Sequence, residues 1–164
     1  MKLKPGDFFC CYSGGLFAKG ILLYEIHDSP DHKAKLSHSG IILNRNGDTF
    51  ESLRTIRKGY IRKYEGKPLL IGRHLLMSSE RAARAIPYML DCWEGRQYPW
   101  WRILFHLVGC ENLGCGDYLV CSELVMRFLK ECGITKDYLG WTPDEIADWM
   151  FFDPLIEIVY REDC

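Results

Sequence analysis

A chain of 164 residues, of which 48% are hydrophobic and 13% aromatic, is long enough to bury its own core, and we expect one domain over residues 1–164. The formal net charge of −1, with Lys and Arg spread along the chain, argues against nucleic-acid binding, which usually needs a basic surface. No apolar run reaches the roughly 18 residues of a transmembrane helix, so we expect no integral membrane segment.

The eight cysteines raise the questions of disulfide bonds and metal binding. Residues 1–5 lead into an acidic turn without the apolar stretch of a signal peptide, so we expect a cytoplasmic location and reduced thiols. Cys110 with Cys115, and the adjacent Cys10 and Cys11, lack the paired spacing of a zinc site, and no histidine pair accompanies them. The expectation is therefore that the protein uses no metal and no other cofactor.

Strand patterns dominate the first half of the chain and helical patterns the second. In chain order, the sequence predicts a strand at residues 7–12, a helix at 16–26, strands at 36–43, 48–53, 54–62 and 69–75, helices at 78–93, within 98–119, at 121–132 and at 143–150, and a strand at 155–160. Because strands and helices are segregated more than they alternate, the predicted fold class is α+β.

Local signals mark the ends of three of these helices. Ser78 has the chemistry of an N-cap, and Thr142 is an N-cap followed by Pro143 at the first helical position. Gly133 follows the helical run that begins at Cys121, and we expect it to end that helix as the C′ glycine.

Cys121 begins that amphipathic helix, and it is the residue that points most directly to chemistry. A cysteine in the first turn of a helix lies at the positive end of the macrodipole, which favours the thiolate that a nucleophile needs. The alternative is that Cys121 only starts the buried apolar stripe, because free cysteines are among the most buried residues.

His38 is the candidate base for this nucleophile, and Glu51 is the candidate for the group that orients the histidine. His38 lies in an apolar run typical of a strand, residues 44–47 supply turn chemistry, and the chain returns through residues 48–53. Glu51 has apolar neighbours on this second arm, where a carboxylate needs a partner unless it faces solvent.

The turn between the two arms decides whether Glu51 can reach His38. Asn46-Gly47 favours a two-residue turn, which would place Glu51 opposite Ile42, roughly 13 Å along the strand from His38. Any pairing whose two residue numbers add to an odd total keeps His38 and Glu51 on one face of the sheet. The role of Glu51 therefore depends on a wider loop or a bulge that moves it towards His38.

Taken together, these residues resemble the circularly permuted branch of the NlpC/P60 papain-like superfamily, in which the histidine and acid segments precede the cysteine helix. The matching segments occur in family order over nearly the whole chain: KPGDFF at residues 4–9, SHSGI at 37–41, FES at 50–52, EGRQY at 94–98, CSELV at 121–125 and TPDEIA at 142–147. Each segment is common by itself, and the specificity lies in their combination and spacing.

The resemblance implies a papain-like fold in permuted order, with an antiparallel sheet or partial barrel packed against helices. It implies that Cys121 is the nucleophile, His38 the base and Glu51 the orienting residue, with Tyr98 as an aromatic residue at the substrate site. The implied activity is that of a thiol hydrolase, an amidase or peptidase, acting by acyl transfer on a small peptide-like or acyl-amide substrate.

Other functions remain open from the sequence. A lipid acyltransferase or phospholipase-like enzyme has a similar permuted layout, and residues 100–108 would then line an acyl groove, although Trp100 and its neighbours also suit a plain core. A binding module could keep the fold without catalysis, and Cys115 and Cys121 could instead sense oxidants. The basic stretch at residues 54–63 is either a solvated strand face or a surface for an anionic lipid or substrate.

Overall fold

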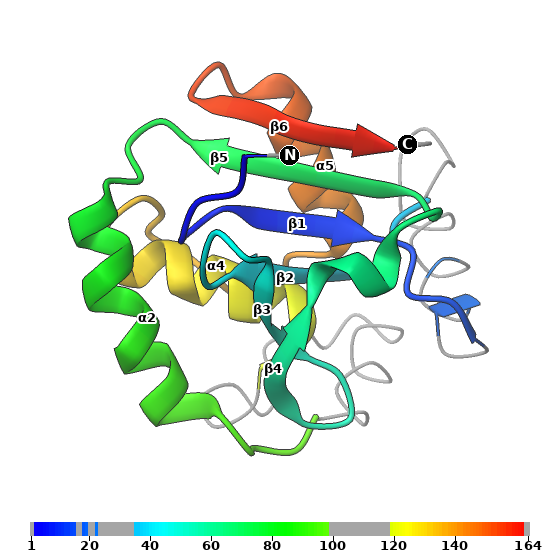
Figure 1. Cartoon of the computed structure of the whole chain (residues 1–164), viewed down its shortest axis with the longest axis horizontal. Helices are drawn as coiled ribbons and strands as arrows, with labels where there is room; N and C mark the ends of the chain where they lie inside the picture. Colours follow the sequence, from blue (N-terminus) through cyan, green and yellow to red (C-terminus); the bar gives the residue numbers. More distant parts are fainter. Residues whose placement is uncertain (1, 16–17, 20–21, 23–34, 99–118, 163–164) are drawn as a thin grey trace.

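A computed structural model describes residues 2–15, 18–19, 22, 35–98 and 119–162 of the chain. Its centre is a six-stranded antiparallel sheet in the order β4-β3-β2-β1-β5-β6 (Figure 1). The strands are β1 (Phe8–Cys11), β2 (His38–Ile42), β3 (Asp48–Ser52), β4 (Ile56–Tyr60), β5 (Leu69–His74) and β6 (Ile156–Glu162). The helices are α2 (Ser79–Trp93), α4 (Cys121–Glu131) and α5 (Pro143–Phe152), and a 3-10 turn, η1 (Ile61–Tyr64), follows β4.

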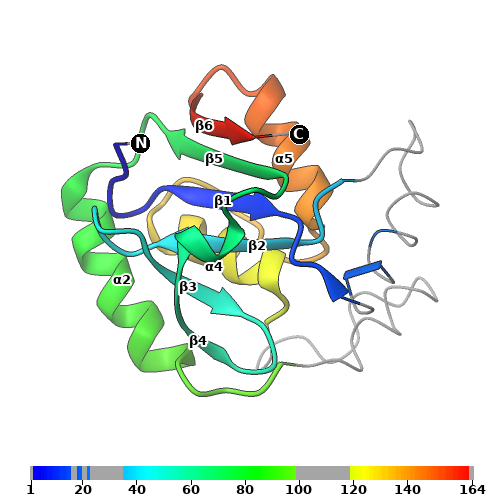
Figure 2. The ribbon, with the colours of Figure 1, turned by 45° about the vertical axis from the view of Figure 1, so that its right-hand side comes forward.

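The helices and η1 lie on opposite faces of the sheet (Figures 1 and 2). On the helical face, Phe8, Ile41 and Phe50 of the strands pack in one buried cluster with Leu124 and Phe128 of α4. The other face holds a smaller cluster, whose buried members are Leu3, Phe9, Cys11, Ile42, Ile61, Tyr64, Leu69 and Ile71. The central strands β1 and β2 are therefore buried on both faces, and side chains on the η1 side are shielded from water as well.

The α+β class is confirmed, and so are the local signals at three helix ends. Ser78 Oγ accepts a hydrogen bond from Arg81 N at the start of α2, and Thr142 Oγ1 accepts one from Glu145 N at the start of α5. Gly133 follows α4 with φ of +68°, which is the left-handed conformation of a C′ glycine. The helix predicted within residues 98–119 and most of the one predicted at 16–26 lie outside the described residues.

The strand predicted at residues 54–62 is wrong at its end, because its last two residues belong to η1. The strand β4 ends at Tyr60, and the chain turns through η1 instead of continuing along the sheet edge. Ile61 and Tyr64, three residues apart, are both buried, and a 3-10 turn places residues at this spacing on the same side. Burial of this pair against the sheet therefore explains the change of direction.

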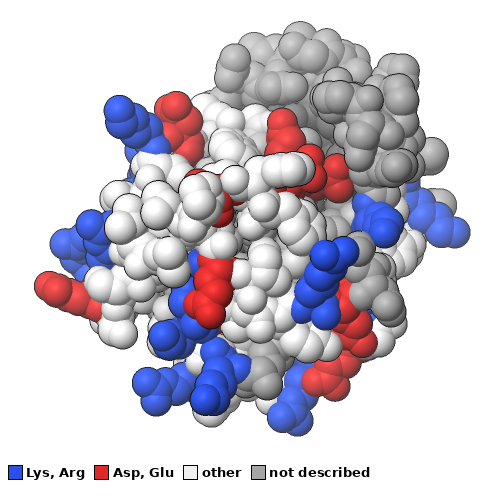
Figure 3. Space-filling model, turned by 90° about the horizontal axis from the view of Figure 1, so that it is seen from above, with Lys and Arg blue, Asp and Glu red and all other residues white. Residues whose placement is uncertain are grey.

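Charged side chains of both signs are interspersed on the molecular surface seen in Figure 3, and neither sign forms a continuous patch there. Arg73, for example, contacts Glu157 on the exposed side of the β5–β6 pair at 3.4 Å. Among the described residues, no helix has both the length and the apolar character that crossing a membrane requires.

Candidate active site

The β2–β3 hairpin is closed by a loop wider than the two-residue turn that Asn46-Gly47 favours. Gly40 pairs with Glu51 and Ile42 with Thr49, so four residues, 44–47, separate the last paired positions, Leu43 and Asp48. Asn44 shapes this loop, because its side-chain oxygen accepts hydrogen bonds from the backbone N–H groups of residues 46 and 48. The two-residue turn favoured by Asn46-Gly47 is therefore not formed.

This register brings the carboxylate of Glu51 to the ring of His38. Glu51 pairs with Gly40, which is two residues along β2 from His38, so the side chains of Glu51 and His38 lie on the same face of the sheet. His38 Nε2 and Glu51 Oε2 are 2.9 Å apart. Both side chains are buried, with 3% of His38 and none of Glu51 exposed. A charge-assisted hydrogen bond in such a dry environment is strong, and it fixes the orientation of the ring.

Glu51 has three further partners. Lys63 Nζ lies 2.9 Å from both carboxylate oxygens, the Tyr64 hydroxyl donates to Oε2 at 2.6 Å, and the Thr49 hydroxyl donates to Oε1. Burial favours the neutral acid, but the hydrogen bond and charge of His38, together with Lys63, outweigh it and lower the Glu51 pKa to about 2. The carboxylate is therefore ionised at neutral pH although it is out of contact with water.

Two glycines make room for this buried carboxylate. A Cβ atom at Gly40 would lie 2.6 Å from the ring of Phe9 and 2.9 Å from Cγ of Glu51. A Cβ atom at Gly59 would lie 2.6 Å from Oε1 of Glu51 and 2.8 Å from the Thr49 hydroxyl. Side chains at these two strand positions would displace Glu51, so their absence is a condition for the contact with His38.

Cys121 is the first residue of α4, as the sequence predicts, and it is 4% exposed. The N–H of Val120, the N-cap, donates to the Glu123 side chain, whereas the following N–H groups of the first turn have no acceptor within the helix. Upstream, the buried Ser52 hydroxyl donates to the Leu119 carbonyl at 2.8 Å, which ties the start of α4 to the end of β3. The helix start is thus held beside the β2–β3 pair.

The thiol of Cys121 lies beside the ring of His38, close enough for each group to shift the pKa of the other. Because Glu51 occupies Nε2, this contact falls to Nδ1. Burial opposes ionisation of the thiol, but the interaction with His38 and its charge outweighs it, and the backbone N–H of Ser39 adds to this effect, so the Cys121 pKa lies below its ordinary value. Burial likewise disfavours the imidazolium, yet the contacts with Cys121 and Glu51 raise the His38 pKa to about 9. These opposite directions favour a thiolate–imidazolium pair.

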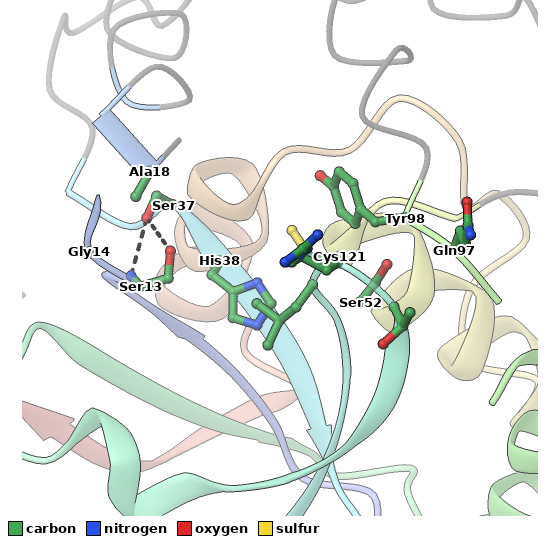
Figure 4. A pocket seen from close by; sticks show the side chains of 12 residues that line it. Ser13, Gly14, Ala18, Ser37, His38, Ser52, Gln97, Tyr98 and Cys121 are labelled. Atoms are coloured by element: carbon green, nitrogen blue, oxygen red, sulfur yellow. Dashed lines mark hydrogen bonds between the residues drawn. The ribbon is translucent and has the colours of Figure 1, made fainter. Parts of the chain in front are cut away.

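This pair lies in the wall of a cavity of about 760 Å³, within the range of about 300–1,000 Å³ that ligand sites occupy. Figure 4 shows His38, Cys121 and Tyr98 around it. The described residues that line it are Ser13, Gly14, Ala18, Ser37, His38, Ser52, Leu53, Arg54, Thr55, Gln97, Tyr98 and Cys121. Tyr98 is held there by the hydrogen bond from its backbone N–H to the Arg54 carbonyl, so the structure brings all four predicted site residues to one place.

Lys63, Tyr64 and Cys11 are the members of this site that sequence analysis missed. Cys11 pairs with His38 across the β1–β2 ladder and lies near the Tyr64 hydroxyl. Its burial, and the nearby charge of Glu51, raise the Cys11 pKa, so it stays a neutral thiol. The sequence of the basic stretch at residues 54–63 does not indicate that Lys63 points towards the sheet. Cys11 and His38 are far apart in the sequence, so no local pattern indicates that they pair.

The remaining sequence interpretations divide between described and undescribed residues. Within the basic stretch, Lys58 pairs with Glu94 and Arg62 with Glu65 at the surface. No disulfide bond joins the described cysteines, Cys10, Cys11, Cys92, Cys121 and Cys132. Cys115 and residues 100–108, on which the redox and acyl-groove alternatives depend, lie outside the described residues.

The described residues do not fit a metal centre. No group of three or more His, Cys, Asp or Glu side chains among them is arranged to hold an ion. The carboxylate of Glu51 is hydrogen-bonded to His38, and Lys63 already places a cation 2.9 Å from both of its oxygens. A metal ion there would meet like-charge repulsion.

Comparison with known proteins gives a likeness of fold. No protein-family model and no curated protein matches the sequence. Among solved structures, the crystal structure of the metalloprotein YiiX from Escherichia coli O157:H7 superposes with a TM-score of 0.67 and 15% sequence identity, and the match covers 99% of each chain. The two proteins therefore share their overall fold from end to end.

Proposed function

We propose that this protein is a cysteine hydrolase that cleaves an amide or ester bond by acyl transfer, and that it belongs to the circularly permuted NlpC/P60 papain-like group. The observation that carries the proposal is the arrangement of three side chains at the wall of a cavity: Cys121 lies beside the His38 ring, and His38 is hydrogen-bonded to Glu51. A nucleophile, a base and an orienting acid in this order are what covalent catalysis requires. The end-to-end likeness to a known fold supports the architecture but carries no activity with it.

The first half of the reaction forms an acyl-enzyme. The thiolate of Cys121 attacks the carbonyl carbon, and the electron pair of the C=O bond moves to the oxygen. The backbone N–H groups of Cys121 and Ser122, at the start of α4, stabilise that oxyanion. When the bond to the leaving group breaks, His38 donates the proton on Nδ1 to the departing nitrogen or oxygen.

The second half releases the acyl group to water. Neutral His38 takes a proton from a water molecule, the hydroxide so formed attacks the thioester, and the thiolate leaves. Glu51 holds the ring through Nε2 in both halves, so Nδ1 faces the reacting atoms throughout. The substrate class that the sequence resemblance favours is a small peptide-like or acyl-amide compound, and Tyr98 contributes to its binding.

Steady-state turnover of a substrate panel tests the proposal. The panel holds matched amides and esters with peptide-like and with fatty acyl groups, each with water alone or with an added amine acceptor. We expect hydrolysis of one class by the wild-type protein, and loss of at least 10³-fold in Cys121→Ser and His38→Ala, as in other nucleophile–base pairs. Cys132→Ser is the control, because this thiol is buried away from the cavity and burial raises its pKa to about 12. Equal turnover in Cys121→Ser and wild type would overturn the proposal.

Transfer to the added amine in preference to water would identify an acyltransferase. Tight binding of a panel member without turnover, unchanged in Cys121→Ser, would identify a binding module that keeps the fold.

A further inference from the structure

Glu51 has more partners than the orientation of one histidine needs. The contact with His38 engages Oε2 alone, yet the same oxygen also faces Lys63 at 2.9 Å and the Tyr64 hydroxyl at 2.6 Å. Both partners come from η1, the turn that begins at Ile61, where the predicted strand was expected to continue. Lys63 is 37% exposed at the side chain, so its ammonium group bridges the buried carboxylate and solvent.

Every element packed around this carboxylate contributes a titratable or charged group. These groups are His38 of β2, Cys11 of β1, Lys63 and Tyr64 of η1 and, across the β3–β4 pair, the exposed Arg57 of β4, with Cys121 of α4 beyond the histidine ring. Apart from the His38 ring, Lys63 is the only cation among the described residues that forms an ion pair with Glu51. Lys63 is therefore the charge that competes most directly with the imidazolium for this carboxylate.

We propose that Lys63 and Tyr64 act through Glu51 as positioning residues that limit how tightly His38 holds its proton. This inference rests on the proposed acyl transfer, because it assigns His38 the role of proton donor to a leaving group. Lys63 and Tyr64 are not among the residues that line the cavity, so any effect they have on the reaction passes through Glu51.

The sign of the effect follows from elementary electrostatics. Lys63 withdraws negative charge from Oε2 and places a positive charge near the ring, and both effects destabilise the imidazolium. The Tyr64 hydroxyl occupies a lone pair of the same oxygen, which weakens its bond to Nε2–H. Removing either partner should therefore raise the His38 pKa, whereas removing the charge of Glu51 should lower it.

A limit on how tightly His38 holds its proton favours the proposed reaction. An imidazolium that is stabilised too strongly by Glu51 and the Cys121 thiolate would hold its proton when the leaving group needs it. A catalytic acid works best when its pKa is near the working pH. Lys63 offsets part of the stabilisation while keeping the carboxylate ionised and in place.

The test is an NMR titration of the His38 ring in the full-length protein, assigned by the loss of its signal in His38→Gln. In Lys63→Met we expect the His38 pKa to rise by roughly 0.5 to 1 pH unit, because the Lys63 charge reaches the ring across one carboxylate oxygen and is partly screened by solvent. In Tyr64→Phe we expect a smaller rise, and in Glu51→Gln a fall. Arg62→Met is the matched control: it removes one cation from the same turn, but Arg62 is 68% exposed and pairs with Glu65.

A purely structural role gives the opposite sign. If Lys63 only held η1 in place, Lys63→Met would loosen Glu51 and lower the His38 pKa. A fall, or a change no larger than that of Arg62→Met, overturns the inference. Lys63→Gln is the second variant should Lys63→Met fail to fold, and Lys63→Arg, which keeps the charge, should restore the wild-type value.

The titration needs no substrate, so its outcome is separate from that of the turnover assay. A rise in Lys63→Met without any hydrolysis by the wild-type protein would sink the proposed function and leave the electrostatic link standing. Hydrolysis that depends on Cys121, with no rise in Lys63→Met, would do the reverse.

Discussion

Glu51 pairs with Gly40 in the β2–β3 ladder, yet its carboxylate lies 2.9 Å from the ring of His38, the residue two positions before Gly40 on β2. The side chain leans along the strand over the space that Gly40 leaves empty, where a Cβ atom would meet its Cγ atom at 2.9 Å. The missing side chain at position 40 therefore allows the diagonal contact on which the proposed orientation of His38 depends.

Gly40→Ala should destabilise the fold and disturb the site together. The new methyl group would collide with the Phe9 ring and with Glu51, and overpacking of this kind costs about 1–3 kcal/mol of unfolding free energy. Chemical denaturation measures that loss, and the rate of Cys121 alkylation measures the effect on the site. Gly72→Ala is the control, because its methyl group would press on the flexible Met150 side chain and on Ile156, far from the carboxylate. Unchanged alkylation in Gly40→Ala would contradict the argument.

Glu51→Gln should fold, with turnover reduced, and Glu51→Ala should reduce turnover further. The amide keeps the shape and one acceptor for the ring but loses the charge that stabilises the imidazolium. Alanine also leaves the buried Tyr64 hydroxyl without its acceptor and removes the ion pair of Lys63, so stability should fall as well. Steady-state kinetics and thermal unfolding of both variants check these effects. Wild-type turnover in Glu51→Ala would exclude Glu51 as the orienting residue.

The unfolding free energy should depend on pH through this pair. The pKa of Glu51 is about 2 in the folded protein and near 4.5 when unfolded, so its contribution is complete above pH 4.5 and is lost as pH falls towards 2. The pKa of His38 is raised from 6.5 to about 9, so its contribution is complete below pH 6.5 and is lost as pH rises through 9. Denaturation at a series of pH values in wild type and Glu51→Gln measures both limbs. Parallel curves for the two proteins at acid pH would contradict this assignment.

Tyr98→Ala should raise KM with little change in the reactivity of Cys121. Tyr98 lines the cavity, and its aromatic ring offers apolar contact area to a substrate, whereas the small reagent iodoacetamide needs no such contact. Substrate titration gives KM, and alkylation kinetics give the reactivity of the thiol. Tyr88→Ala, at an exposed position on α2 that does not line the cavity, should change neither quantity. Equal KM values for Tyr98→Ala and wild type would remove Tyr98 from the substrate site.

The sequence was sufficient to predict the features that depend on neighbouring residues. The start of α4 at Cys121 and its end before Gly133 follow from helical periodicity and from the conformational freedom of glycine. The common face of His38 and Glu51 follows from the two-residue period of a strand, whatever the length of the turn.

The features that depend on distant packing could not be predicted. Asn46-Gly47 favours a tight turn, and the Asn44 side chain overrides it with bonds that the sequence does not reveal. The inward turn of Lys63 depends on the burial of Ile61 and Tyr64 against the sheet, so a run of basic residues looked like a solvated strand. The sequence therefore does not reveal Lys63 and Tyr64 as partners of Glu51.

The rate at which iodoacetamide alkylates Cys121, followed by peptide mass spectrometry from acid to alkaline pH, tests the central claim most directly. We expect Cys121 to react faster near neutral pH than each of the other seven cysteines, because its pKa is lowered by His38. In His38→Ala the neutral-pH rate should drop, and the rise in rate should move to higher pH. If Cys121 reacts no faster than the other cysteines, or equally fast with and without His38, the account of an activated nucleophile is wrong.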